Sequence, residues 1–446
     1  MQPGEHLYLV GGAVRDALLS MPNHDLDFVC AGDPRIIGRK LAEKLSGAFY
    51  MLDDERNACR VIAKNGHNGR LIFDFTQLRG QTLKDDLLER DFTINAMAVD
   101  LNSPSEVIDP LNGSKDLFQK WLRPCKVTSF KDDALRVVRA IRYSVKYHLR
   151  IEQSTINLLM AEKEKLSLVS KERKRDELFK IFEIEEPWAA LELFTQFNIL
   201  EHVCLSGIPD MHHAITRLKI FTELVSSLKA ELSGEGSKGF RIKSFETSFS
   251  EMSPNLCERF SQVNQSERSI HALNDLIALL WDIDEAKGLE AAQCLALSRE
   301  EQEQIVVSIR YRHWILDQFS SRKDPDRRFL YHYFRALGIA GLDVAVMTLV
   351  EAASDPSPLW ANERSTELLS FCQKLVETWF VNPEYVNPKL FITGRDLMFD
   401  FDIPQGPHIG QLLEGLREEQ AIGLIQNRTQ ALTWVENQLQ KGFIKG

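Results

Sequence analysis

Apolar and polar positions follow two different patterns along the chain, and the change falls near residue 128. Before it, the short apolar runs HLYLV, DLDFVC, CRVIA and RLIFDF are typical of strands, and VRDALL and IIGRKLAEKLSG have helical spacing. Beyond it the strand signals vanish, and stretches such as RDELFKIFEIEEPWAALELF and TELLSFCQKLVETWF have the spacing of helices. The pattern predicts an α+β N-terminal region followed by an all-helical remainder.

Three segments interrupt the helical remainder. SGEGSKG (233–239) is rich in Gly and Ser and indicates a flexible insertion, whereas SSRKDPDRR (320–328) and ASDPSP (353–358) are typical of connections between helices. No internal repeat of fixed period is found, so a solenoid built from copies is not supported.

The composition is that of a folded, soluble protein. The 446 residues predict two to four domains, with 44% hydrophobic and 26% charged residues. The seven cysteines are scattered without a CxxC pair, which predicts neither a zinc knuckle nor a disulfide framework, and we expect reduced, structural thiols. The N-terminus lacks a basic leader and no run of about 18 apolar residues occurs, so we expect a cytoplasmic protein with no membrane association.

Charge is distributed unevenly. The whole chain carries 54 Lys plus Arg against 64 Asp plus Glu, a net charge of −10, which argues against binding nucleic acid by bulk charge. From Lys120 to Lys180, however, 16 basic and 8 acidic residues give 16 − 8 = +8. This local basic run suits the phosphate backbone of an RNA stem.

The most informative chemistry lies near the N-terminus. A predicted strand, Leu7 to Val10, leads into Gly11-Gly12 and a helix that carries Arg15, a turn that lets the backbone approach a phosphate. Such a turn alone is more often structural. Asp25 and Asp27 follow on a strand, where residues two apart point to the same side.

Two adjacent carboxylates favour a bound cation, and Mg²⁺ is the ion that carboxylates and substrate phosphates hold together. The alternative is an exposed edge strand with two acids. Asp74, on a later predicted strand, is a candidate third carboxylate for two-metal phosphoryl transfer, or simply an acid at a strand end.

A helix that starts near Ser129 is the candidate for reading a base. Asp133, Arg136, Arg139 and Arg142 recur every three residues, and Ser129 with Asp132 fits an N-terminal capping pattern. An Asp acceptor beside an Arg donor matches the edges of cytosine and adenine and opposes those of uracil and guanine. The alternative is a solvated cationic face with carboxylate partners.

The motifs GGAVRD, DLD, ERDFTINAMAVD (89–100), DPLNG (109–113), DDALRVVRAIR (132–142) and KERKRDELFKIF (171–182) resemble, in order and spacing, the bacterial class II tRNA nucleotidyltransferase and poly(A) polymerase family. The tail segment ITGRDL…IPQGPHIG (392–410) is also similar, whereas about 200–390 matches only in being helical. The resemblance implies a polymerase-beta-like nucleotidyltransferase head (1–127), a helical neck that recognises the base (128–185), a helical body (186–320) and a helical tail that binds tRNA (321–446).

The resemblance also implies Mg²⁺-dependent addition of nucleotides to an RNA 3′ end without a template. By motif, Asp25 and Asp27 hold the metal, and the nucleotide-binding residues are Gly11, Gly12, Arg15, Arg90, Asp133, Arg136, Arg139 and Arg142. Glu172 and Arg173 match the neck motif, where a bracing role is expected. Asp132 stands where many members have Glu. The expected partners are the 3′ acceptor end of tRNA, CTP and possibly ATP, with no stable protein partner.

The choice among family members depends on one segment. Members that add the whole CCA carry a long flexible segment before the RDFT motif, whereas only GQTLKDDLLE separates Arg79 from Arg90 here. This short connection favours a CC-adding enzyme. The alternatives are a complete CCA-adding enzyme, an A-adding or poly(A)-adding enzyme and, in another class, a non-catalytic RNA-binding pseudoenzyme.

Histidines add little to this interpretation. The only His-Asp doublet is His24-Asp25 inside the first motif, so no His-Asp phosphohydrolase domain is expected. His212, His213 and His271 stand in helical stretches without a carboxylate doublet, where packing or surface roles are expected.

Overall fold

The computed structural model describes residues 6–23, 25–54, 57–65, 69–233, 249, 251–321, 324–354 and 363–441. The chain forms two compact units. Unit 1 comprises Met1–Ile184 and Leu193–Val203, and unit 2 comprises Glu185–Glu192 and Cys204–Gly446. The four-part division into head, neck, body and tail remains a prediction.

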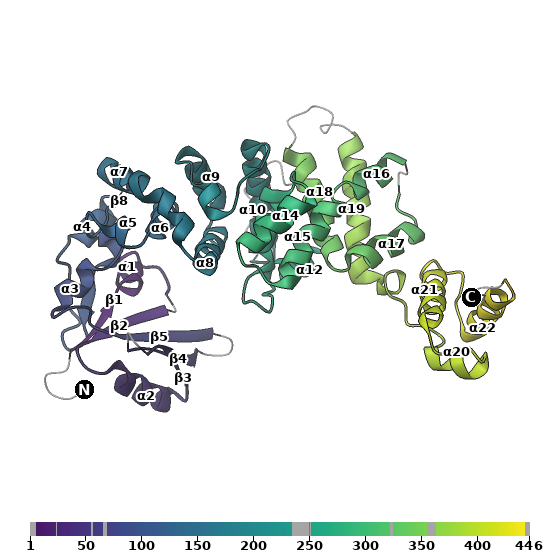
Figure 1. Cartoon of the computed structure of the whole chain (residues 1–446), viewed down its shortest axis with the longest axis horizontal. Helices are drawn as coiled ribbons and strands as arrows, with labels where there is room; N and C mark the ends of the chain where they lie inside the picture. The colour runs from purple at the N-terminus through teal and green to yellow at the C-terminus, as the bar shows by residue number, and fades with distance from the viewer. Residues whose placement is uncertain are drawn as a thin grey trace. The chain divides into compact units, whose positions relative to one another are not determined.

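A seven-stranded sheet with the order β3-β4-β5-β2-β1-β6-β7 forms the centre of unit 1 (Figure 1). The β2–β5 pair is parallel and the other neighbours are antiparallel. The strands are β1 (Leu7–Val10), β2 (Asp25–Cys30), β3 (Ala48–Asp53), β4 (Ala58–Asn65), β5 (Gly69–Gln77), β6 (Ala98–Asp100) and β7 (Val107–Ile108).

The two faces of this sheet have different roles. Leu7, Phe28, Cys59, Val61 and Phe75 form a core with Ala42 of α2 (Pro34–Leu45) on one face. The alternate positions of β2, β4 and β5 point to the opposite face, because successive side chains of a strand alternate. That face therefore receives the polar residues of the expected site, beside α1 (Gly12–Leu18).

The mixed α+β head and the helical remainder are confirmed. All four expected strands and both expected helices form, whereas β3, β6 and β7 were not predicted. Strand β3, AFYMLD, alternates between exposed and partly exposed residues, so its sequence lacks the buried run that marks a central strand. The short elements that complete the head are α3 (Leu83–Leu88), η1 (Thr93–Asn95) and α4 (Gly113–Phe118).

The helices after the head pack against it within unit 1. They are α5 (Ser129–Asp132), α6 (Arg136–Lys146), α7 (Gln153–Glu162), η2 (Lys163–Leu168) and α8 (Lys171–Phe182). The expectation that strands end near residue 128 is wrong in one detail, because β8 (Trp121–Leu122) pairs with β9 (Arg150–Ile151).

The single helix expected from Ser129 onward is also wrong. Asp133 has an extended backbone (φ −151°, ψ 102°) that separates α5 from α6, and its carboxylate accepts a hydrogen bond from the Leu135 amide at 3.2 Å. An aspartate that binds a backbone amide two residues on competes with the helix. The capping pattern fails too, because Thr128 is the N-cap and Asp132 pairs with Lys126 at 3.0 Å.

Unit 2 consists of helices in the part of the chain that the structure describes. They are α10 (Met211–Ser233), α12 (Ser253–Ser261), α13 (Ile270–Leu280), α14 (Glu285–Cys294), α15 (Arg299–Tyr311), α16 (Trp314–Ser321), α17 (Arg327–Leu337), α18 (Ala340–Ser354), α19 (Glu363–Val381), η5 (Pro383–Tyr385), α20 (Gly394–Asp400), α21 (Pro407–Ala421) and α22 (Arg428–Gln440). Helix α9 (Pro187–Gln196) and turn η3 (Leu200–Val203) lie where the chain passes between the units. SGEGSKG and ASDPSP lie largely outside the described residues, and SSRKDPDRR spans the break between α16 and α17.

A disulfide joins Cys204 to Cys294 in unit 2, with the two Cα atoms 5.9 Å apart. The expectation that all thiols are reduced is therefore wrong for this pair. The partners are 90 residues apart, so only the folding of unit 2 brings them together and no local spacing reveals the bond. The other five cysteines form no disulfide, and burial raises the pKa of Cys59 to about 11 and that of Cys125 to about 12.

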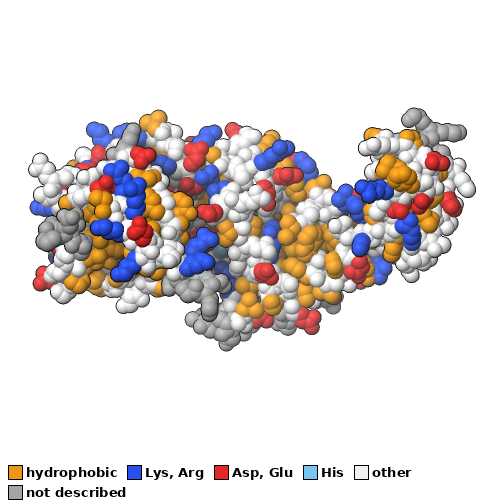
Figure 2. Space-filling model, turned by 90° about the horizontal axis from the view of Figure 1, so that it is seen from below, with side chains coloured by type: hydrophobic (Ala, Val, Ile, Leu, Met, Phe, Trp, Pro, Cys, Tyr) orange, Lys and Arg blue, Asp and Glu red, His pale blue; other side chains and the backbone are white. Residues whose placement is uncertain are grey.

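No single helix among the described residues is long and apolar enough to cross a membrane. The α17–α18 pair passes such a test of length and composition when its two helices are combined, but it bends by 106°. On the face drawn in Figure 2, basic and acidic side chains are interspersed with apolar ones. Of the histidines in helical stretches, His213 pairs with Glu351 at 3.1 Å, and His271 is buried.

Candidate active site

Three aspartates of the expected site lie on one face of the central sheet. Asp27 of β2 stands directly opposite Asp74 of β5 in the parallel register, and Asp25 lies two residues before Asp27 on the same side. Asp25 is exposed at the start of β2, whereas Asp27 and Asp74 are partly buried. The sheet therefore brings together the three carboxylates that the sequence indicated.

The glycine turn approaches this carboxylate group closely. Gly11 has φ +72°, which favours glycine, and a Cβ atom there would lie 2.7 Å from Arg90 Nη1 and 3.7 Å from Asp27 Oδ2. Any side chain at position 11 would displace Arg90. Both glycines of the turn, Gly11 and Gly12, line the same cavity as Asp27.

This cavity lies within unit 1 and has a volume of about 950 Å³. Of the expected residues, those that line it are Gly11, Gly12, Arg15, Asp27, Asp74, Arg90, Asp133, Arg136 and Arg139. The head supplies the carboxylates, the turn, Arg15 and Arg90, and the segment after residue 128 supplies Asp133, Arg136 and Arg139. A volume of this size is typical of a small-molecule site, and its lining is almost entirely charged or polar.

Charge is concentrated around Asp27. Burial raises the pKa of its carboxyl group, Arg90 and Arg60 lower it, and the neighbouring Asp74 and Asp25 raise it again. No hydrogen bond or ion pair to the Asp27 carboxylate is found among the described residues. A carboxylate in these surroundings is suited to a cation.

Asp74 already has a partner. Arg60 of β4 donates from Nε to Oδ1 and from Nη2 to Oδ2, both at 2.8 Å, so the guanidinium holds both carboxylate oxygens. No sequence pattern pointed to Arg60, because the residue opposite Asp74 is known only once β4 and β5 are paired.

The residues present fit a divalent cation at Asp25 and Asp27. Both are hard oxygen donors on one strand face, and Asp27 has a raised pKa beside two like charges. A search of the described residues finds no group of three or more His, Cys, Asp or Glu side chains arranged to hold a metal by themselves. Substrate phosphates would therefore complete the coordination, as is usual for Mg²⁺.

Arg15 is held firmly in place. It is only 5% exposed, and its guanidinium binds Asp16 at 2.7 Å and the Asn95 side chain. It also lies 4.3 Å from the ring centroid of Tyr147. Arg15 therefore lines the cavity in a fixed orientation, with part of its hydrogen-bonding capacity already used.

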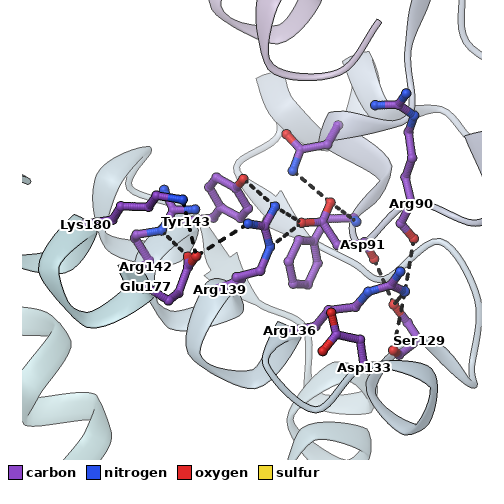
Figure 3. A network of polar contacts seen from close by, with 12 residues as sticks. Arg90, Asp91, Ser129, Asp133, Arg136, Arg139, Arg142, Tyr143, Glu177 and Lys180 are labelled. Atoms are coloured by element: carbon purple, nitrogen blue, oxygen red, sulfur yellow. Dashed lines mark hydrogen bonds and ion pairs between the residues drawn. The ribbon is translucent and has the colours of Figure 1, made fainter. Parts of the chain in front are cut away.

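Asp133 and Arg136 both line the cavity, but each binds another group, and Figure 3 shows the contact of Arg136 with Ser129. Asp133 pairs with Arg173 of α8 at 2.7 Å. Arg136 donates to Ser129 Oγ at 2.7 Å and to the Glu89 carbonyl at 2.8 Å. Arg173 thus makes the bracing contact expected of the neck motif, and a base would meet Asp133 already oriented by it.

Arg139 and Arg142 differ in their access to the cavity. Arg139 binds Asp91 at 2.6 Å and the Tyr143 hydroxyl at 2.9 Å and lines the cavity, as Figure 3 shows. Arg142 is 7% exposed, pairs with Glu177 and does not line the cavity. The structure therefore gives Arg142 a bracing contact, and its expected role on the nucleotide stays a prediction.

Sequence reasoning missed four residues that position the site: Arg60, Asp91, Asn95 and Glu177. Asp91 and Asn95 lie in the ERDFTINA motif, and Glu177 lies in KRDELF. Their position inside motifs that were already identified was the signal that could have pointed to them. Asp91 and Glu89, which lie outside residues 120–180, pair with Arg139 and Lys126 and thus neutralise part of the +8 charge of that run.

The chain is similar in sequence to known proteins. Residues 7–123 match the model of the poly(A) polymerase head domain, and residues 148–215 match the probable RNA- and SrmB-binding site of polymerase A. The CC-adding tRNA nucleotidyltransferase of Geobacter sulfurreducens is 28% identical over 428 residues, which cover 95% of this chain and 90% of that protein.

Two further proteins similar to this chain are named as CCA-adding enzymes. The CCA-adding enzyme of Buchnera aphidicola is 36% identical over 208 residues, 44% of this chain and 49% of that protein. The structure of the Thermotoga maritima CCA-adding enzyme complexed with tRNA has a TM-score of 0.61 at 23% identity, over 98% of this chain and 92% of that one. This last likeness concerns the fold.

Proposed function

We propose that this enzyme, a member of the tRNA nucleotidyltransferase and poly(A) polymerase family, adds cytidines from CTP to the 3′ end of tRNA and releases pyrophosphate. One observation carries the proposal. A single cavity is lined by the Asp27–Asp74 pair, the glycine turn, and Asp133 with Arg136, the residues suited to reaction, triphosphate and base respectively.

Asp25 and Asp27 would hold the divalent metal, for which we propose Mg²⁺ in a two-metal mechanism. Such ions supply charge neutralisation at the phosphates and activation of the attacking 3′ hydroxyl. The chain itself places Arg90 over the glycine turn, where its guanidinium would meet the triphosphate together with Arg15. Both guanidiniums are held by acids, Asp86 and Asp16, so they are oriented before the nucleotide binds.

Asp133 and Arg136 would select the base. The Asp133 carboxylate accepts from the exocyclic amine of cytosine, and the Arg136 guanidinium donates to the ring nitrogen, an arrangement that uracil opposes. Arg173 supports this role because its guanidinium donates to the Asp133 carboxylate at 2.7 Å and so orients it. Arg136 must exchange one of its present contacts to reach the base.

The connection between Arg79 and Arg90 supports CC addition. Most of it forms α3, which begins with a capping box between Thr82 and Asp85. Asp86 then accepts from the Arg79 amide at 3.2 Å and pairs with Arg90 at 3.2 Å. A short segment tied to a nucleotide-binding residue lacks the length to remodel the pocket from C to A. Complete CCA addition is the second candidate, favoured by the Buchnera relative.

Nucleotide addition to three tRNA transcripts tests the proposal. The transcripts end at the discriminator base, at C and at CC, and each is incubated with CTP, ATP, UTP or CTP plus ATP. We expect products that stop at CC, with UTP used at least about 100-fold less efficiently. Addition of A to the CC-ended transcript would identify a complete CCA-adding enzyme. RNA binding without any incorporation would instead indicate a pseudoenzyme.

A further inference from the structure

Arg60, Asp74 and Asp27 stand in one row across three adjacent strands. Arg60 of β4 is the register partner of Asp74 on β5, and Asp74 is the register partner of Asp27 on β2. Neighbouring strands lie about 4.8 Å apart, so side chains of one row on the same face are neighbours. The row thus places a fixed positive charge beside the carboxylates.

The contact between Arg60 and Asp74 is a fork-to-fork ion pair. Two parallel hydrogen bonds of 2.8 Å use both oxygens of Asp74, a geometry that fixes the plane of the carboxylate. The pair is partly exposed, with 37% of the Arg60 side chain and 22% of the Asp74 side chain accessible. Asp74 also lines the cavity.

Arg60 also acts on the other two carboxylates. The pKa of Arg60 is raised first by its hydrogen bonds to Asp74 and then by the charges of Asp74, Asp25 and Asp27. Three acids share this face, and Arg60 reduces their combined charge from −3 to −2.

We propose that Arg60 is a positioning residue that occupies Asp74 in place of a metal ion, so that the divalent ion binds to Asp25 and Asp27 while Asp74 stays paired with Arg60. The inference rests on the proposed function and deepens it. It replaces the expected role of Asp74 as a third metal ligand with that of a carboxylate whose orientation and charge are set by Arg60.

The test is Mn²⁺ binding to the metal-free protein, without nucleotide or RNA, followed by the electron paramagnetic resonance signal of free Mn²⁺. Arg60→Gln frees both oxygens of Asp74 and removes one positive charge. We therefore expect the Kd for Mn²⁺ to fall about three- to tenfold. In the double variant R60Q/D74N this gain should disappear, because the freed carboxylate is no longer present.

Two single variants serve as controls. Arg60→Lys keeps the charge and should leave the Kd within about twofold of wild type. Arg70→Gln removes an exposed arginine from the same strand as Asp74, outside the carboxylate row, and should leave it unchanged. A thermal melt of each variant establishes that it is folded.

Weaker or unchanged Mn²⁺ binding in R60Q, including no binding in either protein, would overturn the inference. If R60Q does not fold, R60K/D74N is compared with R60K instead. The inference predicts that the added D74N substitution weakens Mn²⁺ affinity less than threefold, whereas direct ligation of the metal by Asp74 predicts a loss of more than tenfold. The proposed function fails separately: a wild-type protein that shows this Mn²⁺ pattern but incorporates no CTP would contradict the activity and leave the role of Arg60 intact.

Discussion

Arg139 in unit 1 and Arg217 in unit 2 make the same kind of contact, but they differ in how exposed the guanidinium remains. Each guanidinium binds two carboxylates: Arg139 binds Asp91 and Glu177, and Arg217 binds Asp282 and Glu351. The Arg139 side chain remains 28% exposed and lines the cavity, whereas that of Arg217 is fully buried and also donates to the Ala278 carbonyl.

The comparison shows where a charge network leaves room for a substrate. In unit 1 the acids orient cations that still face an opening, which is preorganisation for a charged ligand. In unit 2 the Arg217 guanidinium joins α10 to α13, to Asp282 just beyond it and to α18, and the guanidinium itself has no exposed surface. Loss of a guanidinium should therefore reduce activity in unit 1 and stability in unit 2.

Arg217→Met should have the largest effect on stability. Arg217 is fully buried and donates to two carboxylates and to the Ala278 carbonyl, so its removal leaves three acceptors without their donor, and we expect the free energy of unfolding of unit 2 to fall by about 3–5 kcal/mol. Hydrogen exchange by mass spectrometry should show faster exchange in α10, α13 and α18 and unchanged exchange in the sheet of unit 1. The control Arg310→Met breaks an exposed pair with Glu285 and should cost less than about 1 kcal/mol. Equal effects of the two variants would break the comparison.

Arg139→Met should mainly reduce turnover. The variant removes a preorganised donor from the cavity, for which a loss of about 100-fold in kcat/KM for CTP is expected. The control Arg39→Met, an exposed residue of α2, should retain wild-type turnover. If Arg139→Met unfolds unit 1 while turnover per folded molecule is unchanged, then Arg139 resembles Arg217 and the contrast between the units is wrong.

The disulfide sharpens the comparison because it acts on unit 2 alone. Cys204 and Cys294 close a long loop, so Cys294→Ser should lower the free energy of unfolding by about 2–4 kcal/mol. Denaturant titrations with and without dithiothreitol provide the measurement. The wild type should lose stability on reduction, and the double variant C204S/C294S should not respond. A wild type that is indifferent to dithiothreitol, and whose intact mass is that of seven free thiols, would contradict the bond.

Acid should weaken unit 2 through Glu301. Burial opposes its charged form, but hydrogen bonds from Arg268, Ser298 and Asn264 outweigh this and lower the pKa to about 2. Because the folded pKa lies below the ordinary 4.5, this stability is fully present above pH 4.5 and is lost as pH falls toward 2, by about 1.4 kcal/mol per pH unit. Thermal melts against pH should show a smaller slope for Glu301→Gln than for the exposed control Glu303→Gln. Equal pH slopes for the two variants would exclude Glu301 as the cause of the acid sensitivity.

The two units also differ in how far their sequences predict them. The site in unit 1 could be anticipated because phosphoryl transfer requires particular residue types at particular spacings, such as Gly11-Gly12 before Asp25 and Asp27. The break at Asp133 was missed because helical spacing alone does not reveal a side chain that binds its own backbone. Arg60 was missed because strand pairing, a long-range property, makes it the partner of Asp74.

In unit 2 the sequence predicted helices but none of the side-chain contacts between them. The triad of Arg217, Asp282 and Glu351 joins residues up to 134 positions apart, and the disulfide joins residues 90 positions apart. Neither follows a local pattern, because packing of amphipathic helices accepts many combinations of residues. Such contacts can be found only from the fold.

CTP incorporation by the Asp27→Asn variant tests the central claim most directly. Radiolabelled CTP is offered to a tRNA transcript that ends at the discriminator base, with Glu43→Gln on the exposed face of α2 as the control. We expect Asp27→Asn to lose at least about 1,000-fold in turnover while it keeps its thermal stability and tRNA affinity, because the proposed metal site loses a carboxylate ligand. Turnover of Asp27→Asn within tenfold of Glu43→Gln would contradict a metal-dependent active site on this sheet.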